Sequence, residues 1–154
     1  MISKSAALLT GVLGVAAMAV LPATAQAATG AITGFGGKCV DVASASNANG
    51  TAIQLYDCNG TTAQQWTVGS DGSLQALGKC LDVAAASNVN GTKVQLYDCN
   101  GTAAQQWTHQ SNGELVNTNS GKCLDATGPS SADGTRLQIW TCSDAANQQW
   151  TLAS

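Results

Sequence analysis

The fold is decided by a stretch that occurs three times: CVDVASASNANGTAIQLYDCNGTTAQQW (residues 39–66), CLDVAAASNVNGTKVQLYDCNGTAAQQW (residues 80–107) and CLDATGPSSADGTRLQIWTCSDAANQQW (residues 123–150). Each copy runs 28 residues from its first Cys to its last Trp without an insertion. The copies begin 41 and 43 residues apart, so the unit repeats about every 42 residues. A fixed period of this length indicates a repeat architecture whose units share one core.

Residues 1–27 are predicted to be a secretion signal peptide, and residues 28–154 the folded domain. Lys4 precedes an apolar run at residues 6–21, and Ala25-Gln26-Ala27 has the small-residue pattern of a signal-peptidase site. The run is too short to span a bilayer comfortably, so no membrane insertion is expected. The mature protein is therefore expected to be secreted and extracellular.

The charge balance argues against nucleic acid as a partner. Without Lys4, five basic and nine acidic side chains remain, a formal net charge of about −4 with no basic cluster. A phosphate backbone is bound through clustered Lys and Arg, which this chain lacks. Abundant Gly, Ser, Thr, Asn and Gln instead favour a β-rich extracellular domain.

All six cysteines lie in the repeats, in pairs that are each 19 residues apart. An exported chain meets an oxidising environment, so disulfides are predicted. The repeat symmetry selects the pairing within each repeat: Cys39 with Cys58, Cys80 with Cys99, and Cys123 with Cys142. No Cys-x-x-Cys occurs, and the only histidine, His109, is expected to be a solvated loop residue. No metal site or cofactor is therefore predicted.

Short strands separated by turn residues predict an all-β fold. Residues 30–35 are expected to form the first strand, and residues 52–58 alternate apolar and polar side chains in the strand manner. Residues 64–68 and 73–77 continue the pattern, and Asn-Gly and Asp-Gly dipeptides mark turns. Each repeat therefore offers about four strands, roughly twelve in all.

The repeats, at about residues 30–70, 71–112 and 113–154, must share one core because units of this length cannot bury a core alone. Four strands per unit also fit a propeller blade, although three blades are fewer than the typical four to eight. The alternative is a closed threefold arrangement, in which one strand pair of each unit forms a barrel and the other pair caps it. The spacing leaves both arrangements open.

Each repeat supplies a carboxylate and an aromatic ring that a disulfide would hold near each other. A sugar has an apolar C–H face and a rim of hydroxyls. Its site therefore needs an aromatic platform and fixed hydrogen-bonding groups, of which a carboxylate is the strongest acceptor. The carboxylates, two residues after the first Cys, are Asp41, Asp82 and Asp125. The rings, two residues before the second Cys, are Tyr56, Tyr97 and Trp140. These pairs predict up to three carbohydrate pockets.

Three copies of Cys-x-Asp, Gln-x-aromatic-x-Cys and Gln-x-Trp in register resemble the ricin B-chain type lectin domain, a β-trefoil. Within it, the chain is most similar to bacterial family 13 carbohydrate-binding modules. The resemblance covers residues 28–154 and implies three shallow sugar pockets and a Trp core on a pseudo-threefold axis. It implies a non-catalytic lectin for galactose- or xylose-containing oligo- or polysaccharides.

By this resemblance the Asp bonds the sugar hydroxyls, the aromatic ring stacks on the sugar, and an Asn three residues before the final Trp adds a hydrogen bond. That residue is Asn147 in the third repeat, but Ala63 and Ala104 in the first two. Asn59 and Asn100, directly after the second Cys, are candidate substitutes. The third pocket is therefore the best candidate.

The remaining side chains that recur at the same position in all three repeats are predicted to lie in the core or in the pocket. Trp66, Trp107 and Trp150 are predicted to pack in the core. Gln64, Gln105 and Gln148 are expected to be mainly structural, although the family sometimes places this Gln near the sugar. For Gln54, Gln95 and Gln138, a bond to the backbone and a bond to the ligand both stay open.

No enzyme is expected, because glycosidic hydrolysis uses two facing carboxylates and each candidate pocket offers one. Two other interpretations stay open: a protein-binding trefoil such as a secreted protease inhibitor, and a decayed lectin kept for its structure. An inhibitor presents one specialised loop, whereas the loops here are short and nearly alike, which favours the lectin. A monomer is expected.

Overall fold

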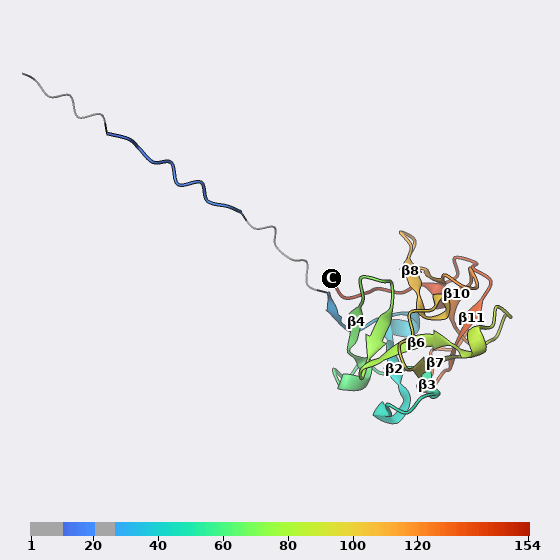
Figure 1. Cartoon of the computed structure of the whole chain (residues 1–154). Coiled ribbons are helices and arrows are strands. Elements are labelled where there is room, and N and C mark those ends of the chain that lie inside the picture. The colour runs from blue at the N-terminus through green and yellow to red at the C-terminus, as the bar shows by residue number, and fades with distance from the viewer. Residues whose placement is uncertain (1–10, 21–26) are drawn as a thin grey trace, which may run out of the picture.

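The computed structural model describes residues 11–20 and 27–154. Residues 11–20 form no helix or strand, and the folded part lies within residues 27–154 (Figure 1). The predicted signal peptide lies partly outside the described residues, so it stays a prediction. Across the described ranges, no helix has the length and hydrophobicity that crossing a membrane requires.

The described residues form an all-β domain, as predicted. Its eleven strands in residues 27–154 are β1 (Thr29–Gly30), β2 (Cys39–Val42), β3 (Thr51–Tyr56), β4 (Trp66–Val68), β5 (Leu74–Ala76), β6 (Lys79–Val83), β7 (Val94–Tyr97), β8 (Trp107–His109), β9 (Leu115–Asn117), β10 (Cys123–Ala126) and β11 (Leu137–Trp140). Single 3-10 turns follow at η1 (Phe35–Gly37), η2 (Ala43–Ala45), η3 (Thr62–Gln64), η4 (Ala84–Ala86), η5 (Ala103–Gln105) and η6 (Ala146–Gln148).

The expectation of a first strand at residues 30–35 is wrong. Pairing covers β1 and the single residue Thr33, which forms isolated bridges with Cys39 and Thr151, and η1 then turns the chain. Gly36 and Gly37, in this turn, adopt φ of 68° and 71°, a left-handed conformation that glycine readily takes. The twelfth strand position is likewise a single bridge, between Thr151 and Thr33.

One strand pair from each repeat contributes to a closed ring. The pairs β1–β4, β4–β5 and β8–β9 are antiparallel. Trp107 N donates to Gly72 O at 2.9 Å and Trp150 N to Gly113 O at 2.8 Å, and Thr33 pairs with Thr151. These contacts join each repeat to the next, and the last repeat to the first. The strands therefore form one closed barrel instead of separate propeller blades.

The other strand pairs form three hairpins, β2–β3, β6–β7 and β10–β11, which cap the ring (Figure 1). They contact each other through β3–β7 pairing and through the bridges Gln54–Arg136 and Lys93–Gln138. The arrangement is a β-trefoil with pseudo-threefold symmetry, and each hairpin presents one face to solvent.

The three tryptophans that end the repeats lie in the core, as predicted. Trp66, Trp107 and Trp150 are 1%, 5% and 2% exposed. Their indole N–H groups donate to the carbonyls of the hairpin strands, at Val40, Leu81 and Leu124. Each Trp therefore ties barrel to cap while its only polar group is satisfied.

The predicted disulfides are all present, with Cα–Cα distances of 5.1 Å in each repeat. In the first repeat Cys39 is in register with Tyr56, two residues before Cys58. The disulfide therefore closes the open end of the hairpin beside the aromatic ring. Each closes a loop of about 20 residues, which contributes on the order of 3 kcal/mol in the chain-entropy model.

Candidate functional site

Strand register brings a carboxylate and an amide together in every hairpin. Asp41 is in register with Gln54, Asp82 with Gln95, and Asp125 with Gln138. Successive side chains of a strand alternate between faces, so the aromatic residue two positions after each Gln lies on the same face. The three carboxylates are 5–7% exposed, whereas Tyr56, Tyr97 and Trp140 are 40%, 40% and 44% exposed.

The third pocket has the most complete polar network. Gln138 Nε2 donates to Asp125 Oδ1 at 2.9 Å, while Asn147 Nδ2 and Gln148 Nε2 donate to Asp125 Oδ2 at 3.0 and 2.9 Å. Thr127, Gly128 and Pro129 also line the cavity, which measures about 560 Å³. The carboxylate is held in one orientation in a cavity that the exposed Trp140 ring also lines.

The first pocket keeps two of these three hydrogen bonds. Gln54 Nε2 and Gln64 Nε2 each donate to the Asp41 carboxylate at 3.0 Å. Ala63 stands where the third repeat has Asn147, so the third donor is missing. The cavity, about 370 Å³, lies beside Tyr56.

The second pocket is the least elaborate. Gln95 Nε2 donates to Asp82 Oδ2 at 2.9 Å, and among the described side chains no further donor bonds this carboxylate. Ala104 replaces the asparagine, and Tyr97 replaces the tryptophan. The cavity measures about 340 Å³ and gains Asn119 as a lining residue from the following repeat.

Most of the predicted site residues line these cavities, but Gln64 and Gln105 do not. Both are 1% exposed; Gln64 accepts from the backbone N–H of Asn59 and Gln105 from that of Asn100. Gln148 bonds Ser143 in the same way, yet it also lines its cavity. This glutamine therefore holds the loop after the second Cys in each repeat.

Asn59 and Asn100, predicted as substitutes for the missing asparagine, do line the first two cavities. Each uses its side-chain oxygen within its own turn: Asn59 Oδ1 accepts from Thr61, and Asn100 Oδ1 accepts from Thr102. The amide nitrogen is therefore the group that each can offer to a ligand.

One wall of each cavity escapes prediction from the sequence. In the first two repeats it consists of Ser44 and Ala45, and of Ala85 and Ala86. These residues have φ between 50° and 56°, a left-handed conformation unusual for residues with a Cβ. Small side chains in an unusual backbone conformation carry no motif that could identify them.

The ricin-type β-trefoil lectin family matches residues 28–150. The chain belongs to this family. The resemblance inferred from the repeats is therefore confirmed, and carbohydrate binding is the general function that the lectin domain implies.

Solved structures support the same assignment. ThreeFoil, a designed threefold symmetric protein, matches with a TM-score of 0.77 and 35% identity, over 82% of this chain and 98% of that one. An agglutinin from Abrus precatorius matches at 0.77 and 31%, over 86% and 51%. A non-toxic homologue of type II ribosome-inactivating proteins from Momordica charantia, in complex with α-methyl-D-galactoside, matches at 0.77 and 33%, over 84% and 49%.

Curated relatives match over shorter stretches. The ribosome-inactivating protein PMRIPt of Polygonatum multiflorum is 45% identical over 47 residues, 30% of this chain and 8% of the relative. A glucan endo-1,3-beta-glucosidase of Cellulosimicrobium cellulans is 47% identical over 57 residues, 37% of this chain and 10% of the relative. The matches thus cover a tenth or less of these two relatives.

The ion pairs of the described residues lie outside the pockets: Lys38–Asp133 joins the first and third repeats, whereas Lys38–Asp57 and Lys79–Asp98 each lie within one repeat. Lys38 bonds Asp133 of the third repeat and Asp57 of its own, and these hydrogen bonds raise the pKa of Lys38. The bond from Lys38 also lowers the pKa of Asp133. At the next junction, hydrogen bonds from Asn49 and then Lys79 lower the pKa of Asp98.

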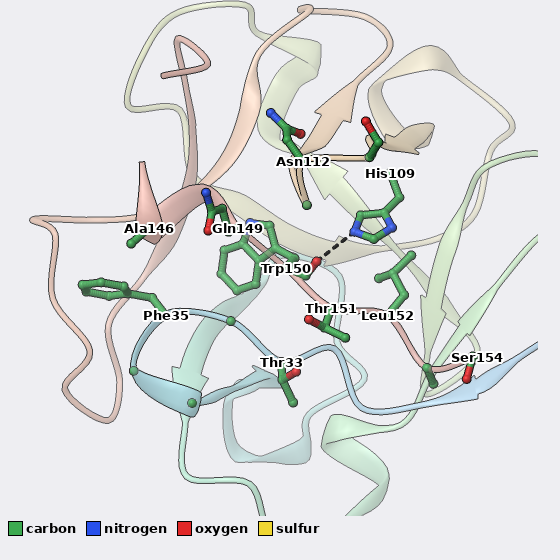
Figure 2. A pocket seen from close by; sticks show the side chains of 16 residues that line it. Thr33, Phe35, His109, Asn112, Ala146, Gln149, Trp150, Thr151, Leu152 and Ser154 are labelled. Carbon is green, nitrogen blue, oxygen red and sulfur yellow. Dashed lines mark hydrogen bonds between the residues drawn. The ribbon is translucent and has the colours of Figure 1, made fainter. Parts of the chain in front are cut away.

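A further cavity of about 900 Å³ lies away from the predicted pockets. Figure 2 shows Phe35, Trp150 and His109 along it, with the His109 ring directed at the Trp150 carbonyl, 2.8 Å away. His109 is exposed as expected but ends strand β8 instead of lying in a loop. Among the described residues no Asp or Glu lines this groove, and Trp150 is buried, so the described lining does not include the carboxylate and exposed ring that the pockets share.

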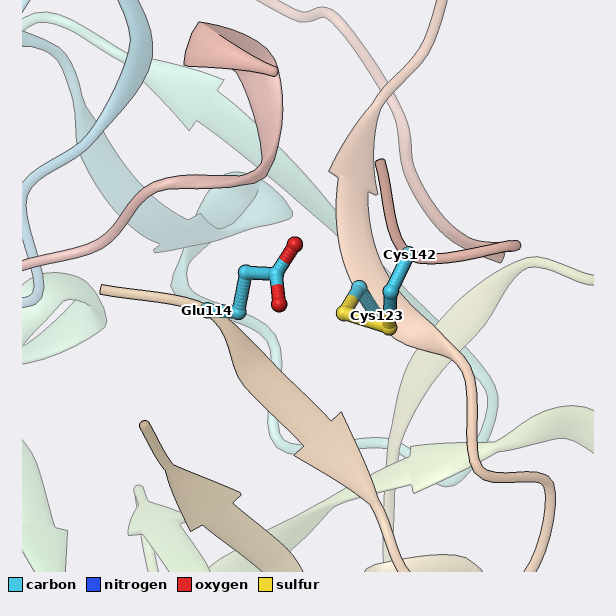
Figure 3. A group of neighbouring side chains, drawn as sticks. All are labelled: Glu114, Cys123 and Cys142. Atoms are coloured by element: carbon cyan, nitrogen blue, oxygen red, sulfur yellow. A yellow bond between two sulfur atoms is a disulfide. The ribbon is translucent and has the colours of Figure 1, made fainter. Parts of the chain in front are cut away.

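Glu114 lies beside the Cys123–Cys142 disulfide (Figure 3). The two sulfurs are bonded to each other, so neither is a thiolate that could ligate a metal. One Glu114 oxygen accepts from the Asp144 backbone N–H at 2.8 Å. This buried carboxylate therefore holds the loop after the disulfide.

Proposed function

We propose that this protein is a secreted, non-catalytic lectin that binds galactose- or xylose-containing glycans through up to three pockets, the third being the principal one. The observation that carries the proposal is the Asp125 carboxylate, nearly buried, fixed by three side-chain amides and lining one cavity with the exposed Trp140 ring.

The chemistry of such a pocket suits a sugar. The three amides use three of the about four acceptor positions of the Asp125 carboxylate, so Oδ1 keeps a lone pair for a sugar hydroxyl. Charge-assisted hydrogen bonds of this kind are the stronger class. The ring of Trp140 offers an apolar surface for the C–H face of the sugar. Because carboxylate and amides are already positioned, little conformational entropy is lost on binding.

Multivalency fits the threefold repeat. A single shallow pocket of this kind is expected to bind one sugar weakly, with Kd on the order of 0.1 to 1 mM. Three pockets on one domain raise the apparent affinity for a polymer through effective concentration. A polymer is therefore expected to bind more tightly than its monosaccharide, and equal affinities would contradict multivalent binding.

A binding role is also supported by what each pocket offers chemically. Hydrolysis of a glycosidic bond uses two carboxylates that flank the substrate, and each cavity is lined by one, at Asp41, Asp82 or Asp125. Three disulfides and the Ala25-Gln26-Ala27 motif support an extracellular location.

Calorimetry of the mature protein with galactose, lactose, xylobiose and soluble xylan tests the proposal. Binding that is lost or sharply reduced in an Asp125→Ala variant, and kept in the matched Asp82→Ala variant, is the expected result. Binding that is unchanged in Asp125→Ala would assign the principal site to another repeat. No heat with any of the four ligands would contradict the galactose and xylose assignment.

A further inference from the structure

The third pocket contains a polar contact that comes from another repeat. Lys93 directly precedes strand β7 of the second hairpin and forms a bridge with Gln138 of the third repeat. Its ammonium donates to Gln138 Oε1 at 3.1 Å and to Thr127 Oγ1 at 3.3 Å. Both acceptors line the third cavity.

This contact extends to the carboxylate. Gln138 accepts from Lys93 through Oε1 and donates through Nε2 to Asp125 Oδ1 at 2.9 Å. A side-chain amide has one acceptor oxygen and one donor nitrogen, and an ammonium can only donate. The positive charge on one side and the carboxylate on the other therefore favour a single orientation of the Gln138 amide.

The other two pockets lack this arrangement. Ala52 is in register with Gln95, and its methyl group offers no donor. Arg136 is bridged to Gln54, but its guanidinium Nη2 donates to the Val94 carbonyl at 3.3 Å. Among the described residues, the ammonium contact to the pocket glutamine is made at the third pocket alone.

The charge of Lys93 is not used in an ion pair. The ion pairs of the described residues involve Lys38 and Lys79. The half-buried ammonium of Lys93 has two neutral acceptors, and both belong to residues that line the third cavity. Its hydrogen bonds therefore fix side chains of the pocket instead of forming a surface salt bridge.

We propose that Lys93 of the second repeat is a positioning residue of the third carbohydrate pocket, acting through the Gln138 amide on Asp125. The inference rests on the proposed function, because it concerns the affinity of that pocket for a sugar. It makes the third site a composite of two repeats.

Lys93→Met tests the inference, since it keeps the aliphatic stem and removes the donor. Trp140 is the one tryptophan of the described residues that lines a sugar pocket, so its fluorescence change and its indole N–H signal in NMR titrations with xylobiose and lactose report the third site. Loss of one hydrogen bond that holds the carboxylate partner predicts affinity about three- to tenfold weaker. Lys93→Arg, which keeps charge and donors, should restore most of it.

The matched control is Arg136→Met, at the equivalent position of the third repeat. It should leave the third-site affinity unchanged. The Gln138 side-chain amide signal should shift in Lys93→Met before any sugar is added, which a general loss of stability would not produce at an unchanged melting temperature.

Two results separate the inference from the proposed function. If the natural protein shifts the Trp140 signal with sugar and Lys93→Met binds equally well, the role of Lys93 is wrong and the lectin assignment stands. If the natural protein gives no Trp140 response to any sugar, the proposed site itself is wrong, and the inference with it.

Discussion

The second and third pockets are built on the same hairpin, disulfide and Asp–Gln register, yet they differ in polar detail. Asp125 accepts hydrogen bonds from three side-chain amides, whereas Asp82 accepts from Gln95 alone among the described side chains. The third cavity measures about 560 Å³ and the second about 340 Å³. Repeat symmetry therefore fixes where a pocket lies, and a few substitutions decide how many hydrogen bonds hold its carboxylate.

The aromatic ring is expected to have the largest effect on this difference. Trp140→Ala should weaken third-site binding by about thirtyfold or more, because truncating an aromatic anchor typically costs 2 kcal/mol or above. Trp140 is 44% exposed, so the fold should be unaffected. Calorimetry with xylobiose and lactose measures the loss, and Tyr97→Ala is the control that should leave the third site intact.

Asn147 should account for a smaller part of the difference in affinity between the third and second pockets. Asn147→Ala removes the hydrogen bonds to Asp125 and to the Ala126 carbonyl and gives the third pocket the alanine of the second. Affinity is expected to fall about three- to tenfold. The reciprocal Ala104→Asn should strengthen the second site, measured in an Asp125→Ala background. An unchanged affinity in Asn147→Ala would remove the reason for ranking the third pocket first.

The smallest effects concern the junctions between repeats. Asp57 and Asp98 sit at junctions that contain a lysine, whereas Thr141 occupies the same position in the third repeat and bonds Asn90 through neutral groups. The pKa values of Asp98 and Asp133 are lowered by hydrogen bonds. Their stabilisation is present above the unfolded pKa of about 3.9 and is lost as pH falls through the lower folded values.

The raised pKa of Lys38 makes folding stability depend on pH in the opposite direction. Its contribution is complete below the unfolded pKa of about 10.4 and is lost as pH rises through the folded value. Thermal melts between pH 2 and 11 should therefore decline at both ends, and Asp133→Asn should flatten both limbs slightly. The carboxylates are exposed, so a large change in melting temperature at pH 7 would contradict this assignment.

Much of the fold was predictable because the repeats impose it. The period, the disulfide pairing and the buried tryptophans follow from residues that recur in register, and the structure confirms them. The first strand was not predictable in its extent, because its pairing depends on Thr67 and Thr151, which are distant in the sequence.

The candidate pockets were predictable where one repeat supplies the groups. Asp125, Trp140 and Asn147 follow from position relative to the cysteines and the final tryptophan. Lys93 was not, because its contact with Gln138 depends on how two hairpins meet around the pseudo-threefold axis. Nor were Ala85 and Ala86, which line a cavity with backbone and methyl groups.

The most direct test of the central claim is an NMR titration of the mature, nitrogen-labelled protein with xylobiose and with lactose. The account predicts that the Trp140 indole signal moves at the lowest concentrations of at least one of these sugars, while those of Trp66, Trp107 and Trp150 stay in place. A sugar that binds while the Trp140 signal stays fixed would contradict the assignment of the third pocket as the principal site.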